Sequence, residues 1–300
     1  MSEHNQDANL AIYSSPEVAG LYAGMTDLAP CEQLLFDAYL HPGMTILDLG
    51  VGGGRTTPYL SLIASHYVGI DYSGEMIRVC RRRFPHLQFE VLDASDLSLF
   101  ADASFDAAVF SYNGLDNLAP NEKRQQCLRE CHRVLRKGGV LIFSSHNPRS
   151  LFLGLQWDRQ RLRALANRLA GGARPLFYLA LAALTCGRIG WALLRSFVRA
   201  IPRAFRRLPT VAFWKGEGYV LDPTHGGLVT HCGVPDRVIA ELTKFHFRLL
   251  QLVPEDYPRK GCQGSTRWYY YAFSKDGIVH SSAFSDRHAG QGNGATALQG

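Results

Sequence analysis

The stretch Ile46–Leu60, ILDLGVGGGRTTPYL, decides the fold. An apolar run ends in a cluster of four glycines, and a helical pattern follows them. Glycine adopts a positive φ without strain and lets a ligand approach the backbone, while the following helix directs free N–H groups toward the same place. In an open parallel sheet, ligands bind at the carboxyl ends of the strands. The stretch therefore predicts a ligand-binding turn at the end of the first strand.

On both sides of this turn, helical patterns alternate with short apolar runs. We expect helices at 30–40, 55–64, 73–84, 122–135 and 235–245, and strands at 44–50, 66–71, 87–94, 105–111, 138–145, 247–253 and 268–274. Strands that are regularly followed by helices build a mostly parallel sheet with helices on both faces. The predicted fold class is α/β: a doubly wound, seven-stranded, mostly parallel sheet with a helical insertion between strands five and six.

Two common ligand classes use a glycine-rich turn of this kind, and the sequence fits neither of them well. A dinucleotide-binding turn reads Gly-x-Gly-x-x-Gly, but counting from Gly50 places Arg55 where the third glycine belongs. A P-loop needs a lysine after its glycines, and this stretch contains none. The pattern that the stretch does match is Asp48-x-Gly50-x-Gly52-x-Gly54.

This pattern resembles that of the class I S-adenosylmethionine-dependent methyltransferases. The resemblance covers roughly residues 13–145 and, more loosely, the last helix and two strands. It rests on four further motifs at the family's intervals: YVGIDYSGEMI (67–77), EVLDAS (90–95), FDAAVFSYNGLDNL (105–118) and CHRVLRKGGVLIFSS (131–145). The resemblance implies a Rossmann-like methyltransferase fold, S-adenosyl-L-methionine as the cofactor, and a transferase that serves small-molecule biosynthesis.

The resemblance also implies which residues bind the cofactor. The Asp71 carboxylate can accept hydrogen bonds from both ribose hydroxyls, and Asp93 can accept one from the adenine amino group. Tyr72 and Met76 can flank the adenine ring. A structural alternative accompanies each role, because strand-end aspartates often cap turns and methionines often pack in cores. The predicted cofactor-binding set is Asp48, Gly50, Gly52, Gly54, Asp71, Tyr72, Met76, Asp93, Ala94, Ser111 and the lid aromatics Tyr13 and Tyr22.

The candidate catalytic residues follow the ends of strands. A sulfonium methyl is already a strong electrophile, so the protein has to align a nucleophile and exclude water, and a base is needed only where the nucleophile must lose a proton. His146, after strand five, is the first candidate for that base, since imidazole titrates near neutrality. A loop histidine with a purely structural role is the alternative. The candidate set is completed by Tyr112, Asn113, His225 and His231.

The net charge of +6 is concentrated in one segment. Eleven arginines stand between residues 151 and 210 against a single acidic residue, Asp158. We prefer to interpret this segment as a lid over the active site. An interfacial helix that makes peripheral contact with anionic lipid, a partner-binding surface, and a solvated basic face are the alternatives.

The chain divides into five predicted parts. These are an N-terminal lid segment (1–29), the cofactor-binding core (30–148), a basic helical insertion (149–215), the C-terminal part of the core sheet (216–275) and a flexible tail (276–300). The amino terminus lacks the order of a signal peptide, and no window has 18 or more uncharged apolar residues. We therefore expect a cytoplasmic protein.

The sequence predicts methyl transfer to an O, N or C nucleophile of a small molecule. No metal is expected, because none of the seven cysteines lies in a CxxC motif and the histidine spacing fits no standard site. No nucleic-acid partner is expected either, and the sequence leaves the oligomeric state open. Two alternatives use the same cofactor motifs: a lyase or cyclisation reaction that releases methylthioadenosine, and a non-catalytic S-adenosylmethionine-binding protein.

Overall fold

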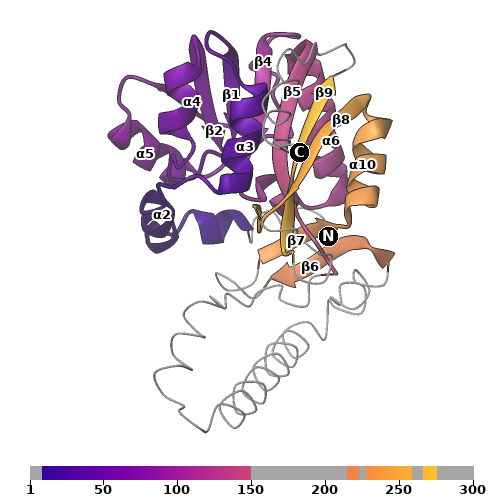
Figure 1. The fold of residues 1–300 in the computed structure, drawn as a ribbon. Helices are drawn as coiled ribbons and strands as arrows, with labels where there is room; N and C mark the ends of the chain where they lie inside the picture. Colours follow the sequence, from indigo (N-terminus) through magenta and orange to yellow (C-terminus); the bar gives the residue numbers. More distant parts are fainter. Residues whose placement is uncertain (1–8, 150–214, 223–227, 259–265, 276–300) are drawn as a thin grey trace, which may run out of the picture.

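The computed structural model describes residues 9–149, 215–222, 228–258 and 266–275. Figure 1 shows a central twisted sheet with helices on both faces. The strands of this sheet are β1 (Thr45–Leu49), β2 (His66–Asp71), β3 (Gln88–Val91), β4 (Phe105–Phe110), β5 (Leu135–His146), β8 (Phe247–Pro254) and β9 (Trp268–Lys275). The helices are α2 (Pro16–Ala23), α3 (Pro30–Tyr39), α4 (Thr57–Ile63), α5 (Gly74–Arg83), η1 (Gly114–Asn117), α6 (Asn121–Val134) and α10 (Pro235–Lys244).

The seven strands lie in the order β3-β2-β1-β4-β5-β9-β8. Neighbouring strands from β3 to β5 pair in parallel, while β9 is antiparallel to both β5 and β8. The predicted doubly wound, seven-stranded, mostly parallel sheet is thereby confirmed, whereas the predicted helical insertion falls on residues outside the described ranges. After β1 the chain builds toward one edge of the sheet, and with β4 it begins to build toward the other. Ligands of open α/β sheets bind at such a reversal of strand order, which here lies at the carboxyl ends of β1 and β4.

The side chains of alternate residues in each central strand pack into two separate hydrophobic cores, one on each face of the sheet. On one face, Leu47 and Leu49 of β1 pack with apolar side chains of α6 and α10. On the other face, Ile46 of the same strand packs with α3, α4 and α5. This alternation follows from the two-residue period of a strand, and it explains why the buried strands read as continuous apolar runs.

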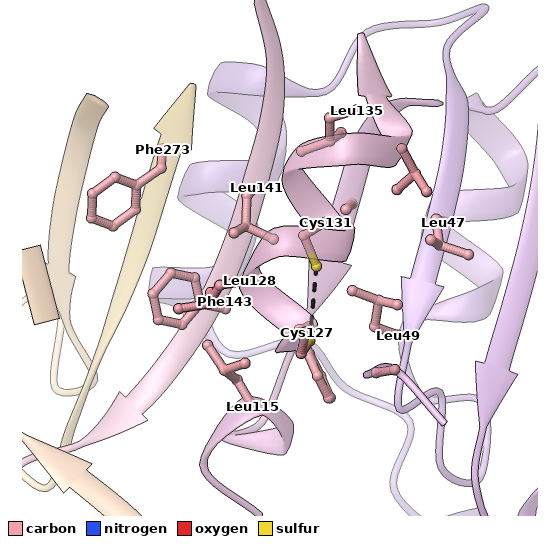
Figure 2. Packing of buried hydrophobic residues seen from close by; sticks show 14 of the residues in the cluster. Leu47, Leu49, Leu115, Cys127, Leu128, Cys131, Leu135, Leu141, Phe143 and Phe273 are labelled. Carbon is pink, nitrogen blue, oxygen red and sulfur yellow. Dashed lines mark hydrogen bonds between the residues drawn. The ribbon is translucent and has the colours of Figure 1, made fainter. Parts of the chain in front are cut away.

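Helix α6 contributes two cysteines to the first of these cores. Figure 2 shows Cys127 and Cys131 facing the side chains of β1 and β5. Their sulfur atoms lie 3.9 Å apart, one helical turn from each other. Every cysteine in the described ranges is a free thiol, and all of these cysteines are buried.

A second, two-stranded sheet was not predicted from the sequence. Strands β6 (Glu217–Asp222) and β7 (Leu228–Gly233) pair antiparallel, with Tyr219 opposite His231. In Figure 1 this hairpin lies below the carboxyl ends of the central strands. It therefore brings the second half of the chain to the end of the sheet where the predicted ligand-binding turn lies.

The basic segment from 151 to 210 and the predicted tail lie outside the described residues. No helix within the described ranges is long and apolar enough to cross a membrane.

Candidate functional site

A cavity opens at the carboxyl ends of β1, β2 and β4, beside the glycine-rich turn. Its lining extends from residue 13 to residue 118. All of the predicted cofactor-binding residues except Gly54 line it: Tyr13, Tyr22, Asp48, Gly50, Gly52, Asp71, Tyr72, Met76, Asp93, Ala94 and Ser111. Residues from four strand ends, those of β1, β2, β3 and β4, and from the N-terminal segment thus converge on one site.

The Asp71 carboxylate is buried between the glycine turn and the start of α5. Its Oδ2 accepts a hydrogen bond from the Gly52 N–H at 2.9 Å, and its Oδ1 accepts one from the Ser73 N–H at 2.9 Å. Burial raises the pKa of Asp71 to about 6, although both backbone donors act in the opposite direction. A carboxylate oxygen can accept more than one hydrogen bond, so Asp71 retains acceptor capacity toward the cavity.

Asp48 connects the turn to the helix that follows it. Its Oδ2 accepts hydrogen bonds from the Thr56 hydroxyl at 2.7 Å and from the Tyr67 hydroxyl at 2.8 Å. Burial raises the pKa of Asp48 to about 7, and these two donors and Arg55 only partly offset that effect. Helix α4 begins at Thr57, two residues later than predicted, because residues 52–56 complete the turn before the first helical hydrogen bonds form.

Two glycines of the turn are required for packing. Gly54 lies behind the cavity with φ +82°, and a Cβ added there would stand 2.7 Å from the Phe84 ring. Gly53 was not singled out by the sequence pattern. A Cβ on Gly53 would stand 2.5 Å from the Ala23 nitrogen and 2.5 Å from the Tyr22 carbonyl carbon. The backbone at the end of α2 therefore rests directly on the turn.

The N-terminal segment covers the cavity with aromatic rings. The Tyr13 ring meets those of Tyr22 and Tyr72 edge to face, at centroid distances of 5.8 Å and 6.1 Å. The Asn117 side chain donates a hydrogen bond to the Tyr13 hydroxyl at 3.0 Å. The buried Tyr72 hydroxyl has no hydrogen-bond partner among the described residues. An unsatisfied polar group beside a cavity is a feature that a polar ligand can satisfy.

Asp93 has both the structural role and the cavity position that the sequence allowed. Its Oδ1 accepts hydrogen bonds from the Ser95 N–H at 2.9 Å and from the Ser95 hydroxyl at 2.8 Å. Its Oδ2 lies 3.1 Å from the Lys123 ammonium. Asp93 thus caps the turn after β3 while also lining the cavity.

A buried ion pair beside the cavity was missed by sequence reasoning. The Arg55 guanidinium donates to both carboxylate oxygens of Glu32, at 2.6 Å and 2.7 Å, and to the Ser111 hydroxyl at 3.0 Å. Arg55 also lies over the Tyr112 ring, 5.2 Å from its centroid. The only signal in the sequence was the arginine at the third glycine position of the dinucleotide pattern. An arginine at that position argues against a dinucleotide, but no local pattern pairs it with Glu32.

The end of β4 carries two neighbouring residues in the left-handed region. Tyr112 has φ 54° and Asn113 has φ 63°. Asparagine tolerates this conformation, whereas for tyrosine it costs free energy. Tyr112 lines the cavity and is 37% exposed, and the Asn113 N–H donates to the Ser144 hydroxyl at 2.7 Å. Strained residues of this kind concentrate at functional sites.

Of the predicted catalytic histidines, His146 and His231 lie within the described residues, and neither lines the cavity. His146 Nε2 is 3.3 Å from the side-chain nitrogen Nδ2 of Asn113, and His146 Nδ1 is 3.0 Å from Asp116 Oδ2. His231 Nδ1 is 3.7 Å from Asp116 Oδ1. The structure thus brings His146, His231 and Asn113 together around one carboxylate that the sequence pattern did not single out. His225 lies outside the described residues.

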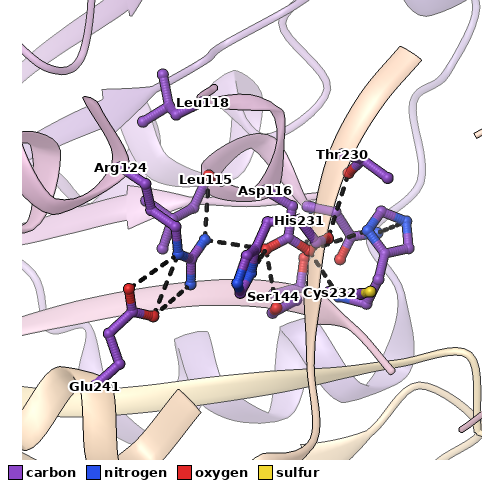
Figure 3. Close-up of polar contacts among 12 residues, drawn as sticks. Leu115, Asp116, Leu118, Arg124, Ser144, Thr230, His231, Cys232 and Glu241 are labelled. Atoms are coloured by element: carbon purple, nitrogen blue, oxygen red, sulfur yellow. Dashed lines mark hydrogen bonds and ion pairs between the residues drawn. The ribbon is translucent and has the colours of Figure 1, made fainter. Parts of the chain in front are cut away.

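Asp116 is the centre of a buried charged cluster, drawn in Figure 3. Its carboxylate also accepts hydrogen bonds from the Ser145 hydroxyl at 2.9 Å and from the Arg124 guanidinium at 3.1 Å. Arg124 in turn pairs with Glu241 of α10 at 3.0 Å. Burial favours the neutral form of Asp116, but the hydrogen bond from His146, the nearby His231 ring and the charge of Arg124 outweigh it and lower the pKa of Asp116 below its ordinary value.

Comparisons with known proteins agree with this geometry. Residues 47–143 match the family model described as a methyltransferase domain. A demethylmenaquinone methyltransferase of Renibacterium salmoninarum is 34% identical over 143 residues, which are 46% of this chain and 58% of that protein. An arsenite methyltransferase of Aquipseudomonas alcaligenes is 33% identical over 144 residues, which are 43% of this chain and 38% of that protein. The match therefore spans 58% of the length of the first of these relatives and 38% of the length of the second.

The fold agrees with a solved structure over most of the chain. The structure of 1,6-didemethyltoxoflavin-N1-methyltransferase from Burkholderia thailandensis, determined with 1,6-didemethyltoxoflavin and S-adenosylhomocysteine bound, has a TM-score of 0.52. The match covers 90% of each chain at 14% sequence identity. At this identity the likeness concerns the fold alone.

Proposed function

We propose that this chain, whose core is a methyltransferase domain of the S-adenosylmethionine-dependent class, transfers the cofactor's methyl group to an O, N or C nucleophile of a small molecule. The observation that carries the proposal is the position of Asp71. Its carboxylate is buried at the end of β2, beside the glycine turn, and lines the cavity at the reversal of strand order. Five relatives named demethylmenaquinone methyltransferase and one named arsenite methyltransferase support a small-molecule acceptor.

The chemistry of the cavity fits S-adenosylmethionine. Asp71 can accept the ribose hydroxyls, and the Tyr72 and Met76 side chains supply apolar walls for adenine. Asp48 faces the same cavity, where a carboxylate can meet the methionyl ammonium. When bound, the cofactor supplies an electrophilic methyl group. The protein's part is then to hold the acceptor in line with that methyl, exclude water and, where the acceptor carries a proton, take it up.

The first experiment measures cofactor binding. Titration calorimetry of the full chain should give binding of S-adenosylhomocysteine, and Asp71→Ala should weaken it by at least about tenfold, since hydrogen bonds to a charged group contribute about 1.5–3 kcal/mol. Asp102→Ala is the matched control, because Asp102 is 79% exposed and does not line the cavity. Unchanged affinity in Asp71→Ala, or preferential binding of NADH, would contradict the proposed cofactor site.

The second experiment identifies the reaction. The chain is incubated with S-adenosylmethionine and a panel of phenols, quinols, amines and arsenite, and the products are followed by mass spectrometry. Methyl transfer yields S-adenosylhomocysteine together with an acceptor that has gained one CH₂. Release of methylthioadenosine would instead favour the lyase or cyclisation alternative. Binding without any product across the panel would favour a non-catalytic protein.

A further inference from the structure

Arg55 is a cation in the wall of a cavity that should receive a cationic cofactor. It is the one arginine or lysine among the described residues that line this cavity, and its side chain is 11% exposed. Arginine keeps its charge in proteins, and the sulfonium of S-adenosylmethionine is also positive. Like charges repel each other more strongly in a partly buried site than in water. The position of Arg55 therefore requires a compensating negative charge.

The Arg55 guanidinium is fixed in place and has little hydrogen-bonding capacity left for a ligand. Its Nη1 donates to Glu32 Oε2 at 2.6 Å and to the Asp27 carbonyl at 3.1 Å. Its Nη2 donates to Glu32 Oε1 at 2.7 Å and to the Ser111 hydroxyl at 3.0 Å. These bonds use every N–H group of the two terminal nitrogens. Arg55 thus joins the chain before α3 to the glycine turn and to the end of β4, and it serves as a wall of the cavity.

Glu32 supplies the compensating charge from behind this wall. Its side chain is fully buried and is not part of the cavity lining. Besides the two hydrogen bonds from Arg55, its carboxylate accepts one from the Ser111 hydroxyl and one from the Ala29 N–H at 3.2 Å. A set of partners that all donate matches an ionised carboxylate, which can only accept. The pair therefore has no net charge, although only its positive member lines the cavity.

Both charges of the pair act on the glycine turn, where the methionyl part of the cofactor should lie. Burial is the largest cause of the raised pKa of Asp48, but Arg55 lowers this pKa and Glu32 raises it. Cys31 and Tyr270 also lie near Glu32, but burial raises the pKa of each far above neutrality, so both stay uncharged. Removal of one charge of the pair should thus change the potential in this part of the cavity, whereas removal of both should nearly preserve it.

We propose that Glu32 is a positioning residue that holds Arg55 in the cavity wall and cancels its charge, so that the cavity accepts the sulfonium of the cofactor. This role rests on the proposed function. S-adenosylmethionine and S-adenosylhomocysteine differ in one methyl group and in the charge on sulfur. The ratio of their affinities therefore reports the potential at sulfur, whereas a defect in packing alone should weaken both ligands alike.

The test is titration calorimetry of the full chain with each ligand at pH 8, well above the ordinary pKa of a glutamate. Glu32→Gln keeps the size of the side chain but leaves Arg55 as an unpaired cation. We expect S-adenosylmethionine to lose about tenfold more affinity than S-adenosylhomocysteine. Unit charges about 12 Å apart interact by about this much at an effective dielectric constant of about 20. Glu32→Asp is the matched control, because it retains the charge, and it should leave the ratio of affinities within about twofold.

Two further variants test the sign of the effect. The double variant Glu32→Gln, Arg55→Gln removes both charges and should return the ratio to within about threefold of that in the natural chain. Arg55→Gln alone leaves a negative charge and should shift the ratio toward S-adenosylmethionine. A natural ratio in Glu32→Gln, or a double variant as impaired as Glu32→Gln, would overturn the proposal. If Glu32→Gln does not fold, Arg55→Gln decides: no shift, or a shift toward S-adenosylhomocysteine, would overturn it.

The two proposals fail in different ways. If neither ligand binds the natural chain, the proposed function is refuted and the role of Glu32 with it. If both ligands bind and their ratio is the same in every variant, only the role of Glu32 is refuted. Neither result depends on turnover, so the acceptor need not be known.

Discussion

Asp48 is a residue whose charge should oppose folding. It is buried beneath the glycine turn, and burial raises its pKa from 3.8 to about 7. Between about pH 4 and pH 7 the folded chain then binds more protons than the unfolded chain, so this residue makes the free energy of unfolding fall as pH rises. Asp48→Asn keeps an oxygen that can accept from Thr56 and Tyr67. It should reduce the stability difference between about pH 5 and pH 8 by up to about 2.7 kcal/mol, because the two pH units below the pKa of about 7 contribute about 1.36 kcal/mol each.

Urea denaturation at the two pH values measures this effect. Part of the slope should remain, because burial also raises the pKa of Asp71, to about 6. Asp102→Asn, at an exposed position, should leave the slope unchanged. If Asp48→Asn retained the full pH dependence of the natural chain, the buried charge of Asp48 would not be its source.

Functional residues can be predicted from the sequence only where they belong to one local sequence pattern. Asp48, Asp71 and Asp93 lie at or within two residues of the ends of successive strands, so a strand period and a family motif place all three. Glu32 and Arg55 instead meet across 23 residues of chain, and Asp116 accepts hydrogen bonds from β5 and α6 and lies 3.7 Å from His231 of β7. No local pattern encodes which distant side chain will neutralise a buried charge, because that depends on the packing of complete elements.

Helix α2 should depend on the missing side chain at Gly53. Gly53→Ala places a methyl group 2.5 Å from the backbone of Ala23 and Tyr22, which cannot be relieved by a side-chain rotation. We expect α2 to be displaced and the affinity for S-adenosylhomocysteine to fall by at least about tenfold, which is roughly 1.4 kcal/mol. The core should remain folded, because α2 contributes no side chain to the two apolar clusters on the faces of the sheet and packs in a third, smaller cluster.

A control lies in α2 itself. A Cβ on Gly20 would meet nothing within 4 Å, so Gly20→Ala should preserve cofactor affinity and stabilise the helix by about 1 kcal/mol. Calorimetry on the two variants compares the same chemical change at two glycines. Equal affinities in Gly53→Ala and the natural chain would show that α2 does not control the cavity.

Secondary structure was predictable in the core and less so beyond it. The seven strands of the main sheet follow from apolar runs bounded by turn residues, and they appear in the expected places. Strands β6 and β7 were missed because both are short and because, within the described part of the chain, they pair only with each other. Without a third strand, the sequence pattern gives few positions from which to infer the pairing.

At the scale of the molecule, cofactor binding should be separable from the basic segment. Every residue that lines the cavity lies between positions 13 and 118. The described residues on either side of the basic segment also lie close together. An Arg149 side-chain nitrogen lies 3.9 Å from the position that a Cβ on Gly216 would take. Replacing residues 151–210 with a short Gly/Ser linker should therefore leave S-adenosylhomocysteine affinity within a few fold. If the segment is a lid, turnover should be abolished.

Liposome flotation distinguishes the membrane interpretation of this segment. The natural chain and the linker variant are compared on vesicles with and without anionic lipid. Retained turnover together with lost binding to anionic vesicles would identify a membrane contact and contradict the lid. Lost cofactor affinity would contradict the separation itself.

The antiparallel strand β9 also has a consequence for the order in which the chain assembles. It lies between β5 and β8, and its pairing with β5 joins Ile142 to Ala272. During synthesis β5 therefore emerges long before its second neighbour, and the central sheet keeps one open edge until the last strand is made. Closing a longer loop costs only about 0.6 kcal/mol for each doubling of its length, so the intervening segment adds little to that cost. The delay is kinetic, and an open strand edge is where unwanted pairing with other chains begins.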